Sequence, residues 1–149
     1  MHRRNILWGA ISAFGAALFA SRASAAAEAA PSAKLKVVYH LNDLDKVSFV
    51  LGNIQNHFDG VGGPEFVTIA LVVHGPALKA FHAPSANSEL RQKLAKLAKQ
   101  GLGLEACGNT MKSQNVTLKD LLPGFVAVEQ GGVVRLAELQ AQGYVYLKP

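Results

Sequence analysis

Hydrophobic residues follow two alternating patterns from residue 34 onward. Short, nearly continuous apolar runs are typical of strands inside a sheet, and apolar positions three or four apart are typical of amphipathic helices. The predicted strands cover residues 34–41, 66–73, 102–106, 125–128 and 144–147. The predicted helices cover residues 44–58, 88–100 and 133–142, with shorter helical or turn segments at 78–82, 108–111 and 117–122. This alternation predicts an α/β fold, a three-layer α/β/α sandwich around a mainly parallel sheet of about five strands.

The ends of these predicted elements carry most of the polar residues. Ser88 is expected to cap the second long helix, which ends at Gly101. The carboxyl ends of parallel strands share one edge of the sheet, and ligands bind outside that edge. The segments expected to meet there are Asn42-Asp43, His74-Gly75-Pro76, Cys107-Gly108-Asn109 and residues 129–132. The order of the strands in the sheet does not follow from this pattern.

The first 33 residues differ in composition from the rest. Residues 1–25 have the form of an export signal, with Arg3-Arg4, an apolar run over residues 6–20 and the small-residue sequence Ala23-Ser24-Ala25. The paired arginines favour the twin-arginine type, with the general secretory route as the alternative. The apolar run is shorter than the ~20 residues that span a bilayer, so no stable membrane anchor is expected after cleavage. Residues 26–33 read as an Ala-rich tether and residues 34–149 as one domain, and the predicted location is the bacterial periplasm.

The basic charge of the chain is concentrated in this signal. The whole sequence has a net charge of +5, and cleavage would remove three arginines and no acidic residue, leaving about +2. Arg91, Lys93, Lys96 and Lys99 fall on the solvated side of a predicted helix. We therefore expect no nucleic acid partner.

Cys107 is the sole cysteine, at the predicted junction of a strand and a helix. Without an intramolecular partner it is either a small apolar core residue or a reactive thiol. Gly108 favours a tight turn and a close backbone approach, and the N–H groups of Asn109 and Thr110 could stabilise a thiolate. His74, at the end of another predicted strand, is a candidate proton donor or positive charge beside the thiol. The candidate site is thus Cys107 as catalytic residue, supported by His74, Gly108 and Asn109.

Other chemistries lack the residues they need. A zinc site requires three or four ligands, and His74, His82 and Cys107 do not have ligand-like spacing, so no metal is predicted. Gly131-Gly132 matches neither dinucleotide-binding nor P-loop motifs, and no cofactor is expected. A G-x-S-x-G nucleophile and a pair of hydrolytic carboxylates are also missing from the sequence.

Several motifs together resemble the DsrE/DsrF-like family of small sulfur-relay proteins, in particular its exported branch. They are residues 38–43 (VYHLND), 73–76 (VHGP), 106–111 (ACGNTM) and 132–140 (GVVRLAELQ) with Gly143-Tyr144, and the similarity extends over nearly all of residues 35–149. The resemblance implies a five-stranded α/β/α domain that forms a homo-oligomer, often a trimer or hexamer. It also implies a cysteine that carries sulfur as a persulfide, here Cys107, and leaves the sulfur donor and acceptor unassigned.

These observations lead to one main functional hypothesis and two alternatives. The main hypothesis is a periplasmic sulfur carrier or sulfurtransferase that holds sulfane sulfur on Cys107. The first alternative is a non-catalytic homo-oligomeric binding module in which Cys107 is a structural residue. In the second, Cys107 forms a disulfide between subunits.

Overall fold

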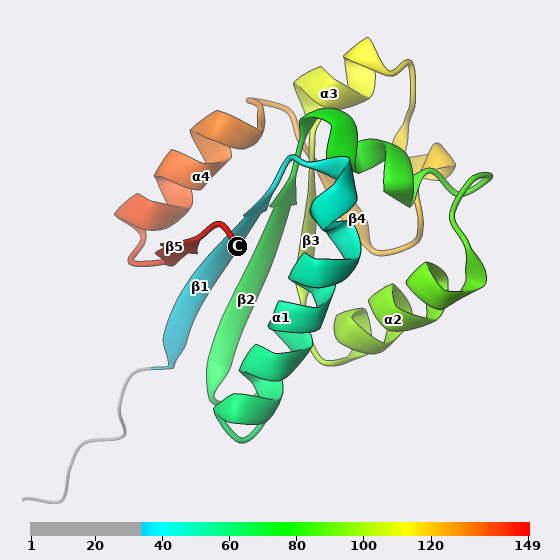
Figure 1. Cartoon of the computed structure of the whole chain (residues 1–149). Coiled ribbons are helices and arrows are strands. Elements are labelled where there is room, and N and C mark those ends of the chain that lie inside the picture. Colours follow the sequence, from blue (N-terminus) through cyan, green and yellow to red (C-terminus); the bar gives the residue numbers. More distant parts are fainter. Residues whose placement is uncertain (1–33) are drawn as a thin grey trace, which may run out of the picture. The chain divides into compact units, whose positions relative to one another are not determined.

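The computed structural model describes residues 34–149 (Figure 1). The predicted export signal at residues 1–25 and tether at 26–33 lie outside the described residues. The strands are β1 (Leu35–Leu41), β2 (Val67–Val73), β3 (Gly103–Cys107), β4 (Phe125–Val128) and β5 (Val145–Leu147). The α-helices are α1 (Val47–Gly60), α2 (Ser88–Lys99), α3 (Gly108–Ser113) and α4 (Gly132–Ala141), and the 3-10 helices are η1 (Leu44–Lys46), η2 (Gly75–Phe81) and η3 (Leu118–Asp120). None of these helices is both long and apolar enough to cross a membrane.

The five strands form a single parallel sheet in the order β4-β3-β2-β1-β5. This confirms the predicted α/β fold and adds the strand order, which the sequence did not supply. In this order β3, which ends at Cys107, lies between β2 and β4. The strand that precedes His74 is therefore the direct neighbour of the strand that carries the cysteine.

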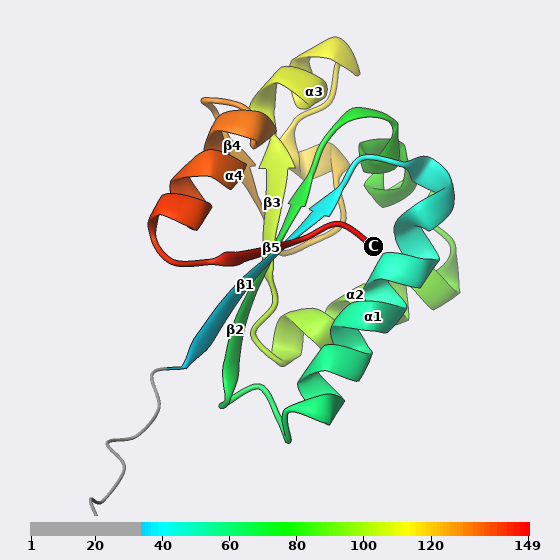
Figure 2. The ribbon, with the colours of Figure 1, turned by 60° about the vertical axis from the view of Figure 1, so that its left-hand side comes forward.

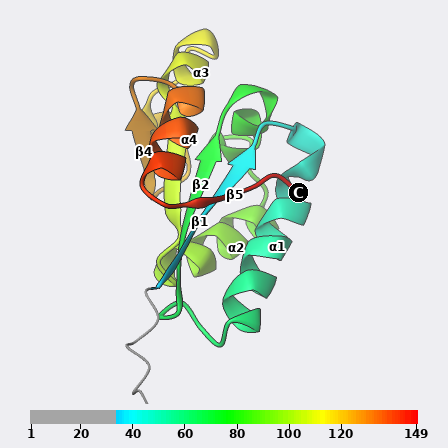
Figure 3. The ribbon, with the colours of Figure 1, turned by 90° about the vertical axis from the view of Figure 1, so that its left-hand side faces the viewer.

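Helices cover the two faces of the sheet unequally (Figures 2 and 3). Helices α1 and α2 lie on one side, which we call the α1 face, and α4 lies alone on the other, the α4 face. The α1 face buries a large core that includes Leu71, Leu104, Phe58 and Phe81. On the α4 face, the described residues form a much smaller hydrophobic cluster, made of Val38, Ala70, Val72, Leu136 and Leu139. The α4 face therefore has room for polar side chains.

The start of α2 differs by one residue from the prediction. Asn87, not Ser88, is the N-cap: its backbone is extended, and its side-chain oxygen accepts a hydrogen bond of 2.8 Å from the Leu90 N–H. Ser88 is already the first helical residue. Asn and Ser are both good caps, and the sequence offered them side by side, so spacing alone did not choose between them.

Candidate active site

The loops at the carboxyl ends of β2, β3 and β4 meet beside Cys107, as the parallel topology predicted. A Cβ atom built on Gly132, the first residue of α4, would lie 3.3 Å from the Cβ of Cys107 and 3.4 Å from the Cβ of His74. The turn after β1 also joins this edge, because Leu41 O accepts from His74 N at 3.0 Å and Asn42 O accepts from Ala77 N at 3.1 Å. Residues from three segments thus lie around the thiol, and the turn after β1 is hydrogen-bonded to one of them.

Cys107 is the last residue of β3 and the N-cap of α3. It is buried, with 6% of its surface exposed. Burial alone raises the pKa of its thiol, but hydrogen bonds from the Thr110 hydroxyl and from the backbone N–H groups of Gly132, Thr110 and Asn109 outweigh this, so that the pKa is lowered. The donors around the sulfur therefore more than offset the effect of burial on the pKa of the thiol.

Thr110 connects Cys107 to the loop after β2. The Thr110 Oγ1 accepts a hydrogen bond of 2.9 Å from the backbone N–H of Gly75. Since that contact uses a lone pair of the hydroxyl, its proton remains available to be donated to the Cys107 sulfur. Thr110 is itself buried, so its hydroxyl has few other partners to choose from. From the sequence, only the N–H group of Thr110 was expected to act on the thiol.

Gly108 allows the start of α3 to approach β4 closely. A Cβ at this position would lie 2.9 Å from Val128 O and 3.2 Å from the Glu129 Cα, which is too close for any side chain. Its φ is not in the left-handed region, so the sequence argument from turn geometry does not apply. The backbone at Gly108 closely approaches the end of β4. This contact fixes the position of α3 and therefore of the N–H groups that face the sulfur.

Asn109 contributes its backbone to the site. Its N–H is one of the donors to Cys107. Its exposed side chain extends toward the next loop, where a Cβ built on Gly131 would lie 2.7 Å from the Asn109 Nδ2. The left-handed backbone of Gly131, with φ 95°, completes this tight turn before α4.

His74 belongs to a row of three polar side chains on the α4 face. The His74 Nε2 lies 2.5 Å from the His40 Nε2, and the His40 Nδ1 lies 2.6 Å from the Tyr146 hydroxyl. Burial is the main cause that lowers the pKa of both histidines, that of His40 to about 4, and the charge of Lys148 lowers both further. Both shifts favour the neutral imidazole, which argues against the interpretation of His74 as a positive charge beside the thiol.

His40 and Tyr146 were not among the site residues predicted from the sequence. In β1, Val38 contributes to the α4-face core, and strand alternation therefore places His40 on the same face. That signal was present in the sequence. The contact with Tyr146 depends on the pairing of β5 with β1, which the sequence did not reveal.

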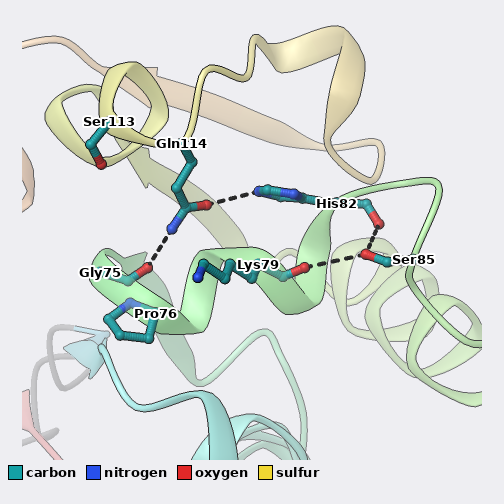
Figure 4. Close-up of a pocket in the computed structure, with 7 residues that line it drawn as sticks. All are labelled: Gly75, Pro76, Lys79, His82, Ser85, Ser113 and Gln114. Atoms are coloured by element: carbon teal, nitrogen blue, oxygen red, sulfur yellow. Dashed lines mark hydrogen bonds between the residues drawn. The ribbon is translucent and has the colours of Figure 1, made fainter.

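A separate depression of about 750 Å³ lies on the other side of Gly75 (Figure 4). Gln114 crosses it, accepting a hydrogen bond from the His82 Nε2 at 2.8 Å and donating one to Gly75 O at 2.9 Å. Its lining residues are Gly75, Pro76, Lys79, His82, Ser85, Ser113 and Gln114. Cys107 does not line this depression, and Gly75 is the residue that links it to the thiol through Thr110.

Among residues 34–149, no three His, Cys, Asp or Glu side chains lie close enough to hold one ion. His82, one of the residues weighed as a ligand, is hydrogen-bonded to Gln114.

Comparisons with known proteins agree with this architecture. A sequence model described as the DsrE/DsrF-like family matches residues 13–149. A protein of unknown function from Methanobacterium thermoautotrophicum has a similar structure, with 26% identity and a TM-score of 0.67 over 77% of this chain and 99% of that one.

Two further solved structures share the fold. A conserved protein of unknown function from Bacteroides thetaiotaomicron has 18% identity and a TM-score of 0.59, covering 80% of this chain and 99% of its own. The ychN protein from E. coli has 15% identity and a TM-score of 0.55, covering 77% of this chain and 99% of its own. No curated protein matches the chain.

Proposed function

The chain belongs to the DsrE/DsrF-like family, and from this premise we propose that it is a sulfur carrier in which Cys107 holds sulfane sulfur as a persulfide. Family membership suggests a function of the sulfur-relay type. The finer assignment to Cys107 comes from the chemistry of the site, because this is the one cysteine in the sequence. The protein acts either as a carrier or as a sulfurtransferase that turns over.

The set of hydrogen-bond donors at Cys107 is the observation that carries the proposal. One hydroxyl and three backbone N–H groups stabilise the sulfur as an anion. A thiol that only fills space in a core does not need donors from the starts of two separate helices, α3 and α4, whereas a nucleophile must be ionised to react. The position at the carboxyl edge of a parallel sheet is also the usual place for a reactive group in this fold class.

The proposed loading step is a displacement at sulfur. The Cys107 thiolate attacks the outer sulfur of a persulfide donor, RS–SH, forming a new S–S bond while the S–S bond of the donor breaks and its thiolate RS⁻ leaves. No net oxidation or reduction is required, since one sulfane sulfur moves from one thiol to another. In the unloading step, an acceptor thiolate attacks the outer sulfur of the Cys107 persulfide and releases the Cys107 thiolate.

Intact-mass measurement tests this proposal. Purified protein is incubated with thiosulfate or polysulfide, and we expect a mass gain of one sulfur atom that is removed by excess thiol. Cys107→Ser is the matched variant, because it keeps a small polar side chain with the same hydrogen-bond neighbours. An unchanged mass in the wild-type protein, or the same gain in Cys107→Ser, contradicts the proposal.

The low exposure of Cys107, 6%, favours one alternative, a binding module with a structural cysteine. The two functions predict different reactivity. A carrier requires alkylation of the native protein well below the pH at which an ordinary thiol with a pKa of about 8.5 reacts. A structural thiol is alkylated only as fast as the protein unfolds.

The proposal extends to location and assembly. The sequence of residues 1–25 supports export to the periplasm, which cell fractionation of a tagged protein would test. Exposed hydrophobic side chains on β4, β5 and α4, namely Val126, Val133, Val134, Val145 and Tyr146, support a homo-oligomer. Light scattering should then give the mass of a trimer or hexamer, and a monomer mass at micromolar concentration would contradict this part.

A further inference from the structure

Four polar side chains lie on adjacent strands at the carboxyl edge of the α4 face. They are Tyr146 on β5, His40 on β1, His74 directly after β2 and Cys107 at the end of β3, and the sheet order β3-β2-β1-β5 makes each strand the neighbour of the next. We propose that Tyr146, His40 and His74 form a proton relay that serves sulfur transfer at Cys107. The relay rests on the proposed function and adds residues to it.

The geometry of the two histidines is that of a directed hydrogen bond. Their ring centres are 4.7 Å apart and the ring planes differ by 22°, while the two Nε2 atoms are separated by 2.5 Å. Since the nitrogens are much closer than the ring centres, the rings meet through their nitrogen edges and not through their faces. One Nε2 must therefore carry the proton and the other must accept it.

This bond couples the protonation of both rings and of Tyr146. If the tyrosine hydroxyl donates to the His40 Nδ1, then the His40 Nε2–H donates to the His74 Nε2, and the His74 Nδ1 carries a proton. In the other form, each proton has moved one position along the row away from Tyr146, and the proton of the His74 Nδ1 has left. The His74 Nδ1 then has a free lone pair. The row thus has two forms, one that donates a proton at the His74 Nδ1 and one that accepts a proton there.

Every member of the row is neutral in both forms, which suits the surroundings. Burial disfavours an imidazolium at His40 and at His74, and the nearby positive charge of Lys148 also opposes protonation of both rings. The negative charge of Asp43 has the opposite effect, and it acts on His40 only. A concerted shift avoids a charged intermediate. The outer end, Tyr146, is 38% exposed and can exchange its proton with water.

The Cβ of His74, the inner residue of the row, lies near the same residue, Gly132, as the Cβ of Cys107, but the His74 ring is not a hydrogen-bond partner of the sulfur. The Cβ atoms of His74 and Cys107 flank the same point at Gly132, at 3.4 and 3.3 Å. The hydrogen bonds that stabilise the sulfur come from Thr110, Gly132 and Asn109. Because these donors already lower the pKa of the thiol, the group left for the His74 Nδ1 to serve is the second thiol in the exchange.

The two forms match the two half-reactions. During loading, the donor thiolate RS⁻ leaves and takes the proton from the His74 Nδ1, and Tyr146 takes up a proton from water. During unloading, the acceptor thiol gives its proton to the His74 Nδ1 as it attacks the Cys107 persulfide, and Tyr146 releases a proton to water. Each half-reaction returns the row to the form that the other one needs.

The test compares two reactions of Cys107 that differ in their need for a proton. Glutathione persulfide is the sulfur donor and its leaving thiolate needs a proton, whereas iodoacetamide releases iodide, which needs none. Both rates are measured by rapid quenching and intact mass on the full chain. General acid catalysis is worth about 10²–10⁴-fold, so we expect His74→Asn to slow sulfur loading by about 100-fold, and Tyr146→Phe and His40→Asn by about tenfold.

Alkylation by iodoacetamide should stay within about twofold in all three variants, because their effect is on the leaving group and not on the thiolate. His57→Asn is the matched control, since His57 also pairs with a tyrosine, its Nδ1 lying 3.0 Å from the Tyr39 hydroxyl, but belongs to α1. It should change neither rate.

The outcomes separate the relay from the function on which it rests. Normal loading in Tyr146→Phe and His40→Asn overturns the relay and leaves the sulfur carrier intact. A parallel loss of loading and alkylation also overturns it, because the residues would then act on Cys107 itself. If the wild-type protein takes up no sulfur from the persulfide, both proposals are wrong.

Discussion

The two faces of the sheet differ in what they bury. The α1 face is closed by α1, α2 and η2, and its side chains are almost entirely apolar. The α4 face is covered by one helix and carries Cys107, His40, His74 and the ion pair between Glu105 and Arg135. One face thus supplies most of the hydrophobic stabilisation, while the polar and ionisable groups occupy the other.

This division explains how a domain of this size can hold a buried thiol with several hydrogen-bond donors and two coupled histidines. Buried polar groups are costly unless each has a partner, and a small core cannot bear many of them. Because the large core of the α1 face provides most of the stability, the α4 face can contain polar groups that reduce it. Changes on the first face should therefore alter stability, and changes on the second should alter reactivity.

The largest expected effect is on the α1 face. Phe81 is fully buried and packs edge-on against Phe125, with ring centres 5.2 Å apart. Phe81→Ala should lower the free energy of unfolding by about 3–5 kcal/mol, as measured by urea denaturation. The folded fraction should still react with iodoacetamide at the wild-type rate. A loss of thiol reactivity in the folded protein would mean that the two faces are not independent.

Cys107→Ser is the reciprocal change on the α4 face. It should abolish sulfur uptake but change the free energy of unfolding by less than about 1 kcal/mol, because the volume and hydrogen bonds are largely kept. Urea denaturation and intact mass measure the two effects on the same preparation.

The ion pair on the α4 face is an exception to this division, because its removal should change stability and not reactivity. Arg135 donates to both carboxylate oxygens of the nearly buried Glu105, at 2.7 and 2.8 Å, and this bonding raises the pKa of Arg135. Arg135→Met should cost about 1–3 kcal/mol, since it leaves a carboxylate with little solvent. Glu138→Gln is the control: this exposed partner lies 3.6 Å from Arg135 and should contribute less than about 0.5 kcal/mol. Equal losses would show that burial of the pair is unimportant.

Thr110→Val should raise the pKa of Cys107. The variant removes the hydroxyl that stabilises the thiolate, so alkylation at pH 7 should be roughly three- to tenfold slower, with the pH profile shifted upward. Thr110→Ser keeps the hydroxyl and should restore most of the rate. If both variants react alike, the hydroxyl of Thr110 is not what lowers the pKa of Cys107.

The smallest expected effect concerns pH and His40. Its pKa is lowered to about 4 by burial and by His74. Between about pH 4 and the ordinary value near 6.5, the unfolded chain binds a proton that the folded protein does not, so this histidine makes stability fall as pH decreases through that range. His40→Gln should flatten the pH dependence of the urea midpoint there. His57→Gln is the comparison, and an equal flattening in both would assign the effect elsewhere.

Local patterns in the sequence were sufficient to predict the elements and their direction. The apolar runs and helical spacing located all five strands, and the alternation implied a parallel sheet with Cys107 at its carboxyl edge. The N–H groups of Asn109 and Thr110 follow from the same reasoning, since they begin the helix after the strand. These features depend on residues that are close in the sequence.

The remaining parts of the site depend on strand order. Tyr146 reaches His40 because β5 pairs with β1, and Arg135 reaches Glu105 because α4 packs over β3. A helix that crosses back over a sheet can pack on either face and over several strands, and the hydrophobic pattern of each element is the same in every case. Long-range partners of this kind need the three-dimensional arrangement.

Gly132 shows how a residue without a functional group can influence the chemistry at another. Its N–H is a donor to Cys107, and a Cβ there would already be tight against Cys107, His74 and Val72. The first turn of α4 can come this near only because the position has no side chain. A larger residue would keep the same N–H but hold it farther from the sulfur, so the acidity of the thiol depends on the absence of a side chain at Gly132.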